Sequence, residues 1–426
     1  MPTTRRQFIK RGAAMAGVSF LLPEILLKGA HGQTAVDPNR RILVVIQLEG
    51  GNDGLNTVVP YTNDRYFSLR PVLGIRESEL QDAQGKSTII TNKLGFHPVM
   101  GGIKDLYDKG RVAVVLGAGD GPNPGLSHFI ASDIWQVANV AGDNSEGWLG
   151  KFADQGLAQG AGVRVLSSDD RSPRALASKK AIFPNVPSFA AYNFQTDAKY
   201  PGNGRRQLST FNTYNSESFP PDSFLAAAAE IGLDAVEQAD RIGAVPSTYQ
   251  SPVIYPANNP LAARLKMVAQ IIIAIPEVEI LYVRLGGFDH HAAQGVAGNK
   301  RIGQHATLLQ YFSDGVKAFY DDMVAHGLAD NVLLLQWSEF GRRPNENGSL
   351  GTDHGAGSLM FVMGNPVRGG LYGQQSSLAP GDVDSDGNPR TVVDFRAVYA
   401  TVIEKWMGGD SQLVLGKQFE NVGFLG

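Results

Sequence analysis

The sequence contains no cysteine, and it has no long apolar run beyond its N-terminal segment. Without cysteine the chain forms no disulfide, so its stability must come from a large core or from bound metal. The most apolar later segment, residues 267–275, is shorter than the ~20 residues that a membrane-spanning helix needs. We therefore expect no permanent membrane anchor, and a chain of 426 residues can bury a sizeable core.

An excess of basic charge is also absent. The N-terminal 32 residues carry five Lys or Arg and one Glu. Without them, Lys+Arg falls from 38 to 33 and Asp+Glu from 41 to 40, which leaves a net charge near −7. A negative protein repels other polyanions. We therefore expect neither nucleic acid nor an anionic membrane as the main partner.

Residues 1–32 have the pattern of a twin-arginine export signal. A basic start that contains Arg5 and Arg6 is followed by an apolar stretch and by small residues. Paired arginines followed by an apolar residue and a lysine resemble the address read by the twin-arginine translocase. The alternative is an ordinary secretory signal or an uncleaved anchor. We expect cleavage before Gln33, contact with the translocase during export, and a protein that works in the periplasm or is secreted.

The rest of the chain, residues 33–426, predicts an α/β domain. Short runs rich in Val, Ile and Leu end in glycine or polar clusters and predict buried parallel strands at residues 41–49, 111–117, 277–285, 331–337 and 359–363. Helical periodicity lies between them, at residues 97–109, 261–275 and 305–326. Strands that alternate with helices indicate a doubly wound, mostly parallel sheet.

The middle of the chain has a different composition. Residues 160–260 are rich in Asn, Ser, Pro and Tyr, and only residues 223–242 show a strong helical pattern. Residues 209–216 are polar and predict an exposed loop. We therefore expect an inserted cap or subdomain that shapes a substrate pocket.

Polar residues of catalytic types follow the predicted strands. Ligands of open α/β sheets gather at the carboxyl ends of the strands, and the residues found there are Asp53, Ser127, Asp289, His291, Glu339, Arg342, Asp353 and His354. Asp, Glu and His together are ligands for zinc, manganese or a similar ion. Each residue taken alone is also explained by a turn or by a surface position. Their common placement favours a metal site over coincidence.

Three of these predictions carry a geometric argument. Asp289 and His291 are two residues apart, so in an extended segment their side chains point to the same side, and His290 points away. Ser127 stands at the expected start of a helix, where it is either a nucleophile beside an anion site or an ordinary helix cap. Arg342 is suited to grip an anionic substrate with its planar guanidinium.

The same motifs resemble a known family. In residues 50–54, 127–129, 287–291, 338–342 and 351–355, the chain resembles a functionally uncharacterised family of twin-arginine-exported bacterial proteins within the alkaline phosphatase and sulfatase superfamily. The resemblance implies an alkaline-phosphatase-like core, a two-metal site and hydrolysis of phosphate or sulfate esters. It implies that Asp53 binds one metal, that Asp289, His291 and His354 bind the second, and that Ser127 is the nucleophile.

The chain departs from the superfamily at two places. Glu339 and Phe340 stand where the superfamily has Asp-His, which removes one imidazole, and Asp353 could replace it. The nearest sulfatase-like string, residues 171–174, has no cysteine or serine two residues before Pro173. Formylglycine-type sulfatase activity is therefore not expected.

Two hypotheses about function follow. The first is an exported hydrolase of small or polymer-borne phosphate or sulfate esters, with one or two divalent ions such as zinc, manganese or calcium. The second is a non-catalytic periplasmic binding protein that keeps the fold with one metal ion or none. The replacement at Glu339 and Phe340 favours the second hypothesis.

Overall fold

The computed structural model describes residues 37–121, 125–141, 146–157, 162–192, 196, 199–200, 202–221 and 223–426. The predicted export signal lies outside the described residues. The fold described below is that of the compact unit Arg41–Gly426. None of the described helices is long and apolar enough to cross a membrane.

Within the described residues, the main sheet has eight strands. Its spatial order is β11 (Gly370–Gly373), β4 (Val112–Gly119), β10 (Ser358–Met363), β7 (Val332–Trp337), β1 (Ile42–Leu48), β6 (Ile280–Leu285) and β5 (Val165–Ser167), and β12 (Val393–Asp394) pairs with β4. Strand β1 lies between β6 and β7 and runs parallel to both. The predicted doubly wound, mostly parallel sheet is confirmed.

Strand β10 corrects one prediction, because it runs antiparallel to both of its neighbours, β4 and β7. The chain between β7 and β10 forms a hairpin of β8 (Gly341–Glu346) and β9 (Thr352–Gly355) and contains no helix. A parallel return needs a crossover connection, whereas an antiparallel neighbour does not. The apolar run at residues 359–363 predicted a buried strand correctly but carried no signal for its direction.

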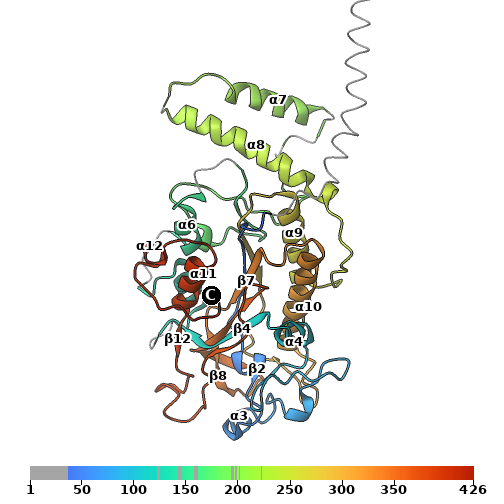
Figure 1. Cartoon of the computed structure of the whole chain (residues 1–426), viewed down its shortest axis with the longest axis vertical. Helices are drawn as coiled ribbons and strands as arrows, with labels where there is room; N and C mark the ends of the chain where they lie inside the picture. The colour runs from blue at the N-terminus through green and yellow to red at the C-terminus, as the bar shows by residue number, and fades with distance from the viewer. Residues whose placement is uncertain are drawn as a thin grey trace, which may run out of the picture. The chain divides into compact units, whose positions relative to one another are not determined.

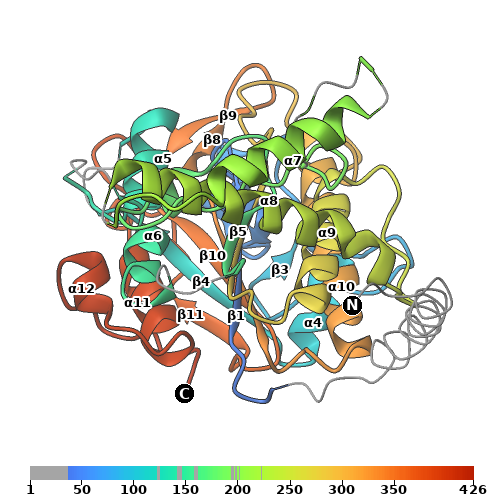
Figure 2. The ribbon, with the colours of Figure 1, turned by 90° about the horizontal axis from the view of Figure 1, so that it is seen from above.

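Helices cover both faces of the sheet (Figures 1 and 2). Alternate residues of β1 face opposite sides. Ile42 and Val44 pack in a core with α4 (Gly101–Asp108), α9 (Pro260–Ala274) and α10 (Gln304–Ala325). Leu43 and Val45 pack in a second core with α5 (His128–Val137), α6 (Trp148–Ala153), α11 (Phe395–Lys405) and α12 (Ser411–Leu415). The two cores bury β1 on both of its faces.

Smaller elements complete the unit. They are α2 (Gly54–Thr57), β2 (Val58–Val59), α3 (Asp64–Leu69), η1 (Glu77–Glu79), β3 (Gly95–Phe96) and η3 (Arg174–Leu176). Strands β2 and β3 form a two-stranded sheet of their own.

The segment predicted as an insertion, residues 160–260, has two parts. Its beginning contributes β5, which pairs with β6 at the edge of the main sheet. Its later part forms α7 (Asn203–Asn215) and α8 (Phe224–Thr248), which project from the sheet core in Figure 1. The predicted loop at residues 209–216 is wrong, because most of it lies in α7. This helix buries no residue, so its sequence lacks the apolar stripe that would identify it.

Candidate metal centre

The site forms where the exits of β1, β6 and β7 meet at one edge of the sheet. The exits of β1 and β6 pack so closely that a Cβ on Gly50 would lie 2.5 Å from the backbone nitrogen of Asp289. Gly50 also has a φ of 120°, which side chains disfavour. The glycine after β1 therefore allows Asp289 to approach the centre of the sheet edge.

Three imidazoles converge on one carboxylate at this edge. The Oδ1 atom of Asp289 lies 3.3 Å from Nε2 of His128, 3.2 Å from Nε2 of His291 and 3.4 Å from Nε2 of His354. The Nε2 atoms of His291 and His354 are 2.9 Å apart. We call these four residues the histidine cluster. The ligand atoms of His128, Asp289 and His354 all lie within 4.8 Å of one another, so they could hold a metal ion.

The other ring nitrogen of each imidazole faces a hydrogen-bond acceptor. His354 Nδ1 lies 2.7 Å from the backbone oxygen of Leu126, which can only accept. His128 Nδ1 lies 2.9 Å from Glu339, and His291 Nδ1 lies 3.2 Å from Asp353. A neutral ring that donates from Nδ1 to its acceptor presents the lone pair of Nε2 to the cluster. This is the orientation of metal-binding histidines, in which an outer acceptor fixes the tautomer.

The electrostatics of the cluster also suit a cation. Burial raises the pKa of Asp289, but the hydrogen bond and the charge of the Arg342 guanidinium outweigh it, and the pKa falls to about 2. Burial lowers the pKa of His354. Asp289 is therefore charged and His354 neutral at pH 7, as metal ligands must be. The hydrogen bond to Glu339 raises the pKa of His128, which makes its imidazole a more basic ligand.

Glu339 and Asp353, two predicted ligands, orient the histidines in this structure. Glu339 is buried and accepts from the backbone N–H of Gly50 at 2.7 Å as well as from His128. Asp353 is half-exposed and accepts from His291 and from Asn347. Both carboxylates contact the Nδ1 side of an imidazole, away from the point where the Nε2 atoms meet.

Arg342 is occupied by the protein itself. Its guanidinium donates to the backbone oxygens of Gly50, Gly51, Phe288 and Thr352 and to Asp289 Oδ1. Its side chain is 1% exposed, and the pairing of β8 with β9 sets it opposite His354. The structure thus gives Arg342 a positioning role at Asp289, in place of the substrate contact predicted from the sequence.

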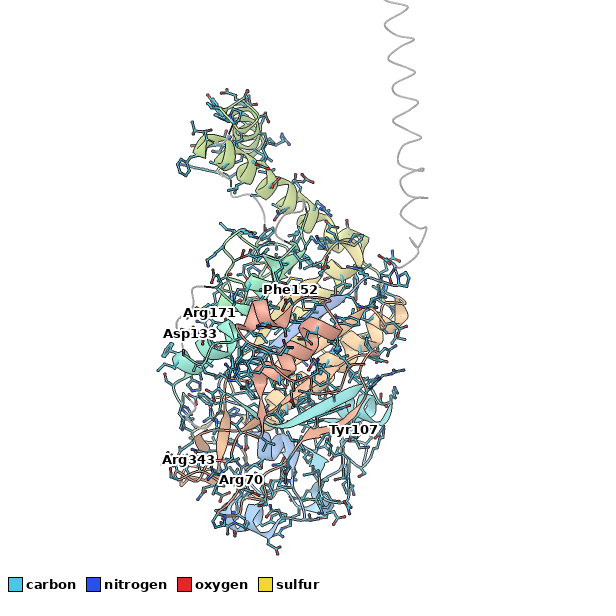
Figure 3. All side chains as sticks on the ribbon, turned by 60° about the vertical axis from the view of Figure 1, so that its left-hand side comes forward. Arg70, Tyr107, Asp133, Phe152, Arg171 and Arg343 are labelled. Atoms are coloured by element: carbon cyan, nitrogen blue, oxygen red, sulfur yellow. The ribbon has the colours of Figure 1, made fainter. Side chains whose placement is uncertain are left out.

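Asp53 lies apart from the histidine cluster, in a buried ion pair. Its Oδ2 atom is 2.6 Å from Arg70 and accepts from Gln294 at 2.5 Å. Its Oδ1 atom caps α2 by accepting from the N–H groups of Leu55 and Asn56. Figure 3 shows Arg70 next to Arg343, well below Arg171. Both oxygens of Asp53 are therefore satisfied by protein donors.

Ser127 and His290 flank the cluster. Ser127 is the N-cap residue of α5, yet its side chain makes no capping hydrogen bond. His290 is buried, as expected for a residue that points away from Asp289 and His291, and it packs against His305. His128 also belongs to the cluster, although it was not among the metal ligands predicted from the residues that follow the strands. Its signal was its place directly after Ser127, at the start of a helix that follows β4.

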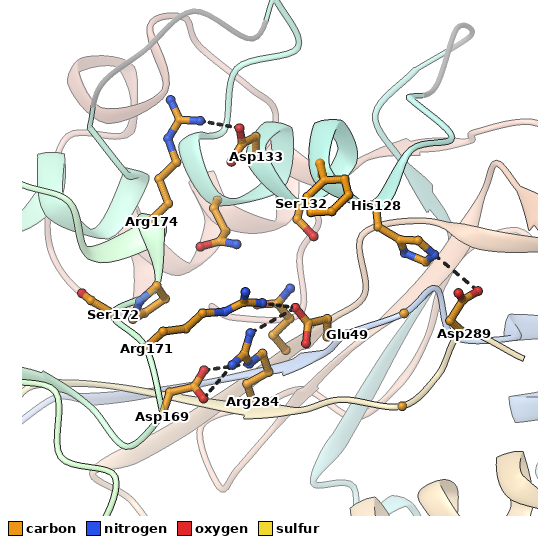
Figure 4. A pocket seen from close by; sticks show the side chains of 16 residues that line it. Glu49, His128, Ser132, Asp133, Asp169, Arg171, Ser172, Arg174, Arg284 and Asp289 are labelled. Atoms are coloured by element: carbon orange, nitrogen blue, oxygen red, sulfur yellow. Dashed lines mark hydrogen bonds and ion pairs between the residues drawn. The ribbon is translucent and has the colours of Figure 1, made fainter.

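A cavity of about 480 Å³ opens beside the cluster (Figure 4). One wall is α5, which presents His128, Ser132 and Gln136 at helical spacing. Asp289 closes the near end. The opposite wall carries Arg171 and Arg284, the first of which belongs to the sulfatase-like string. A ligand in this cavity would contact both the histidine cluster and arginine side chains.

Comparison with known proteins gives one family and several distant structures. A family model described as "Protein of unknown function (DUF1501)" matches residues 40–415. None of the curated proteins matches the chain. Among solved structures, the chain is similar to a sulfatase from Pseudoalteromonas sp., with 11% identity, a TM-score of 0.36, and coverage of 95% of this chain and 75% of that one.

Two further structures are similar at the same level. One is the lipoteichoic acid synthase LtaP from Listeria monocytogenes, with 10% identity, a TM-score of 0.31, and coverage of 94% of this chain and 80% of that one. The other is the phosphonate monoester hydrolase of Agrobacterium radiobacter, with 8% identity and a TM-score of 0.31. The match covers 89% of this chain and 78% of that one. Because identities are this low, the chemistry must be argued from the site itself.

Proposed function

This chain belongs to the family of unknown function DUF1501, and from the geometry of its site we propose that it is a metal-dependent hydrolase of phosphate or sulfate esters. The observation that carries the proposal is the histidine cluster, in which three Nε2 lone pairs and one carboxylate oxygen meet beside a cavity. The resemblance of the motifs to the alkaline phosphatase and sulfatase superfamily supports the ester class.

The donor set favours zinc or manganese. His128, His291, His354 and Asp289 would hold the ion, and imidazoles suit zinc and other transition metals, whereas calcium prefers oxygen ligands. A divalent ion here would polarise the ester group and offset the charge that develops on its oxygens. The described residues bring together one candidate group of ligand atoms, from His128, Asp289 and His354, with His291 beside it, so we propose one ion per chain.

The protein's own residues would do the remaining work. Glu339 and Asp353 keep the Nε2 atoms of His128 and His291 turned inward. Arg342 holds Asp289 in place. Ser127 is free of a capping bond at the start of α5, where helix N–H groups favour an anion. The attacking group in this proposal is the Ser127 hydroxyl or a water molecule.

Metal analysis and an ester panel test this proposal. Purified protein should contain about one equivalent of metal and hydrolyse phosphomonoester, phosphodiester or sulfate ester substrates. His354→Ala should lose both metal and hydrolysis, and His326→Ala, a histidine outside the cluster, should keep both. Hydrolysis that survives exhaustive chelation would rule out the metal. Full activity in Ser127→Ala would assign the attack to water.

A non-catalytic binding protein is the second candidate. It is favoured by the presence of one cluster in the described residues, where the superfamily resemblance implies two metals. In that case the protein would contain one ion and bind an anionic ligand, while no substrate of the ester panel would turn over. Metal content together with absent hydrolysis would establish this alternative.

We also propose that the protein is exported folded, by the twin-arginine route, to the periplasm or beyond. The metal ligands come from three separate segments, near His128, Asp289 and His354, so no local site exists before folding. Export of a folded protein would let the metal bind in the cytoplasm. Replacing Arg5 and Arg6 with lysine should retain the protein in the cytoplasm, as cell fractionation would measure.

A further inference from the structure

Three arginines line the cavity, and each is paired with a carboxylate (Figure 4). Arg171 contacts Glu49 at 2.6 Å. Arg174 contacts Asp133 at 2.5 Å. The third, Arg284, is described below. An anion that enters the cavity therefore meets guanidinium groups that already donate to a protein carboxylate.

Arg284 is fixed in the wall of the cavity. Its guanidinium reaches Glu49 at 3.0 Å, and it reaches Asp169 through Nε at 2.8 Å and through a terminal nitrogen at 3.0 Å. The Arg284 side chain is 14% exposed, and Asp169 is buried. Moving Arg284 would break both of its contacts to buried Asp169 and leave that carboxylate with Arg264 alone, at 3.2 Å, which is costly. Arg284 is therefore structural.

Arg171 differs from Arg284 in exposure and in number of contacts. Its side chain is 69% exposed, and Glu49 is the one carboxylate that it contacts among the described residues. Glu49 in turn contacts two cations, Arg171 and Arg284. If Arg171 rotates away, Glu49 keeps Arg284 as its partner. The exchange leaves no unpaired carboxylate behind.

Arg174 lacks this arrangement. It pairs with Asp133, for which the described residues provide no second cation. A ligand that displaced Asp133 from Arg174 would leave that carboxylate without a cation among the described residues. Of the three arginines, Arg171 thus has the lowest cost of exchanging its carboxylate for a ligand oxygen.

We propose that Arg171 is the anion-binding residue of the cavity. Glu49 positions the Arg171 guanidinium while the cavity is empty, and the oxyanion of the ligand displaces Glu49 from it. The guanidinium of Arg171 would then form paired hydrogen bonds to two oxygens of a tetrahedral phosphate or sulfate group. Glu49 remains neutralised by Arg284 while the ligand is bound. The inference rests on the proposed function, since it names the residue that selects the anionic ester group.

The exchange predicts opposite effects at the two partners. Arg171→Gln removes the guanidinium group. Loss of a hydrogen bond to a charged group should weaken phosphate or sulfate binding by about tenfold to a hundredfold. Glu49→Gln removes the competitor and should strengthen binding severalfold. Arg284 would still be held by both oxygens of Asp169 in that variant.

The test is isothermal titration of the full chain with inorganic phosphate and, separately, sulfate. Metal-loaded and metal-stripped protein are both titrated, and metal content and circular dichroism establish that each variant is folded. Arg174→Gln is the matched control, because it removes an arginine from the same string, and its anion affinity should stay within about twofold of the parent. Arg171→Lys should recover part of the anion affinity, since lysine restores the positive charge but not the planar guanidinium.

The outcomes separate this inference from the proposed function. Unchanged anion affinity in Arg171→Gln, or weaker binding in Glu49→Gln, overturns the role of Arg171 even if the protein hydrolyses esters. Arg171-dependent anion binding in a protein without hydrolysis supports the subsite and contradicts the enzyme. Equal losses in Arg171→Gln and Arg174→Gln would indicate a general effect of positive charge and would also overturn the inference.

Discussion

The Nε2 atoms of His291 and His354 lie 2.9 Å apart, and the Nδ1 atom of each ring faces an acceptor on its other side. Two lone pairs therefore point at each other. This arrangement is repulsive unless a cation or a proton lies with them, and zinc binds imidazole nitrogens at about 2.0–2.1 Å. The pair is the clearest structural reason to expect a metal ion in this protein.

Metal binding should therefore stabilise the folded state. Free zinc at one hundred times its dissociation constant should add about 2.7 kcal/mol to the free energy of unfolding. Thermal unfolding with and without a chelator measures this difference. His291→Ala should abolish the response to metal, whereas His326→Ala should retain it. An equal response in both variants would place the metal elsewhere.

Glu339 should tune the metal affinity through His128. Glu339→Gln keeps an oxygen for the N–H of Gly50 but weakens the acceptor of His128 Nδ1, so metal affinity should fall about 10- to 100-fold. Competition with a fluorescent chelator measures the affinity. Asp353→Asn is the comparison, because Asp353 is half-exposed and water can replace it. Its effect should be smaller, and the reverse order would contradict the assigned roles.

The location of the site could be predicted from the sequence for a physical reason. Residues 42–48, 280–285 and 332–337 are continuous apolar runs, and such runs are typical of parallel strands buried on both faces. Because parallel strands end at the same edge, the polar residues that follow them come together. Asp289, His291 and His354 do meet at this edge.

The role of each polar residue could not be predicted from the sequence pattern. Asp53 and Asp289 are both aspartates after a central strand, but four protein donors surround Asp53. Arg342 is consumed by backbone oxygens that come from distant segments. The number of donors around Asp53 and of acceptors around Arg342 depends on tertiary packing, which brings distant segments together. His128 likewise becomes part of the cluster only because α5 starts over the exit of β7, where Glu339 lies.

The ion pair of Asp53 and Arg70 should contribute to stability and not to metal binding. Both side chains are buried, so Arg70→Met leaves an unpaired carboxylate and should cost about 3–5 kcal/mol of unfolding free energy. Asp53→Asn should keep its metal, whereas Asp289→Asn should lose it. Urea unfolding and elemental analysis measure the two quantities. Loss of metal from a folded Asp53→Asn protein would restore the ligand role implied by the family resemblance.

The stability of the folded protein should fall as the pH is lowered, because the protein buries neutral histidines outside the histidine cluster. Burial lowers the pKa of His97 to about 3, from an ordinary value of 6.5, and it also lowers the pKa of His305. Between pH 6.5 and 3 the unfolded chain therefore binds more protons than the folded protein does. Each such histidine contributes stability that is full above pH 6.5 and declines by about 1.4 kcal/mol per pH unit below it.

Substitution of His97 isolates this contribution. His97→Gln removes the titrating group, so its unfolding free energy should be lower at pH 7 but should fall less steeply between pH 6.5 and 4. The difference in slope should approach 1.4 kcal/mol per pH unit. Urea unfolding at four pH values, with a chelator present so that metal release does not contribute, measures it. Parallel slopes for the parent and His97→Gln would mean that His97 is already protonated or exposed in the folded protein.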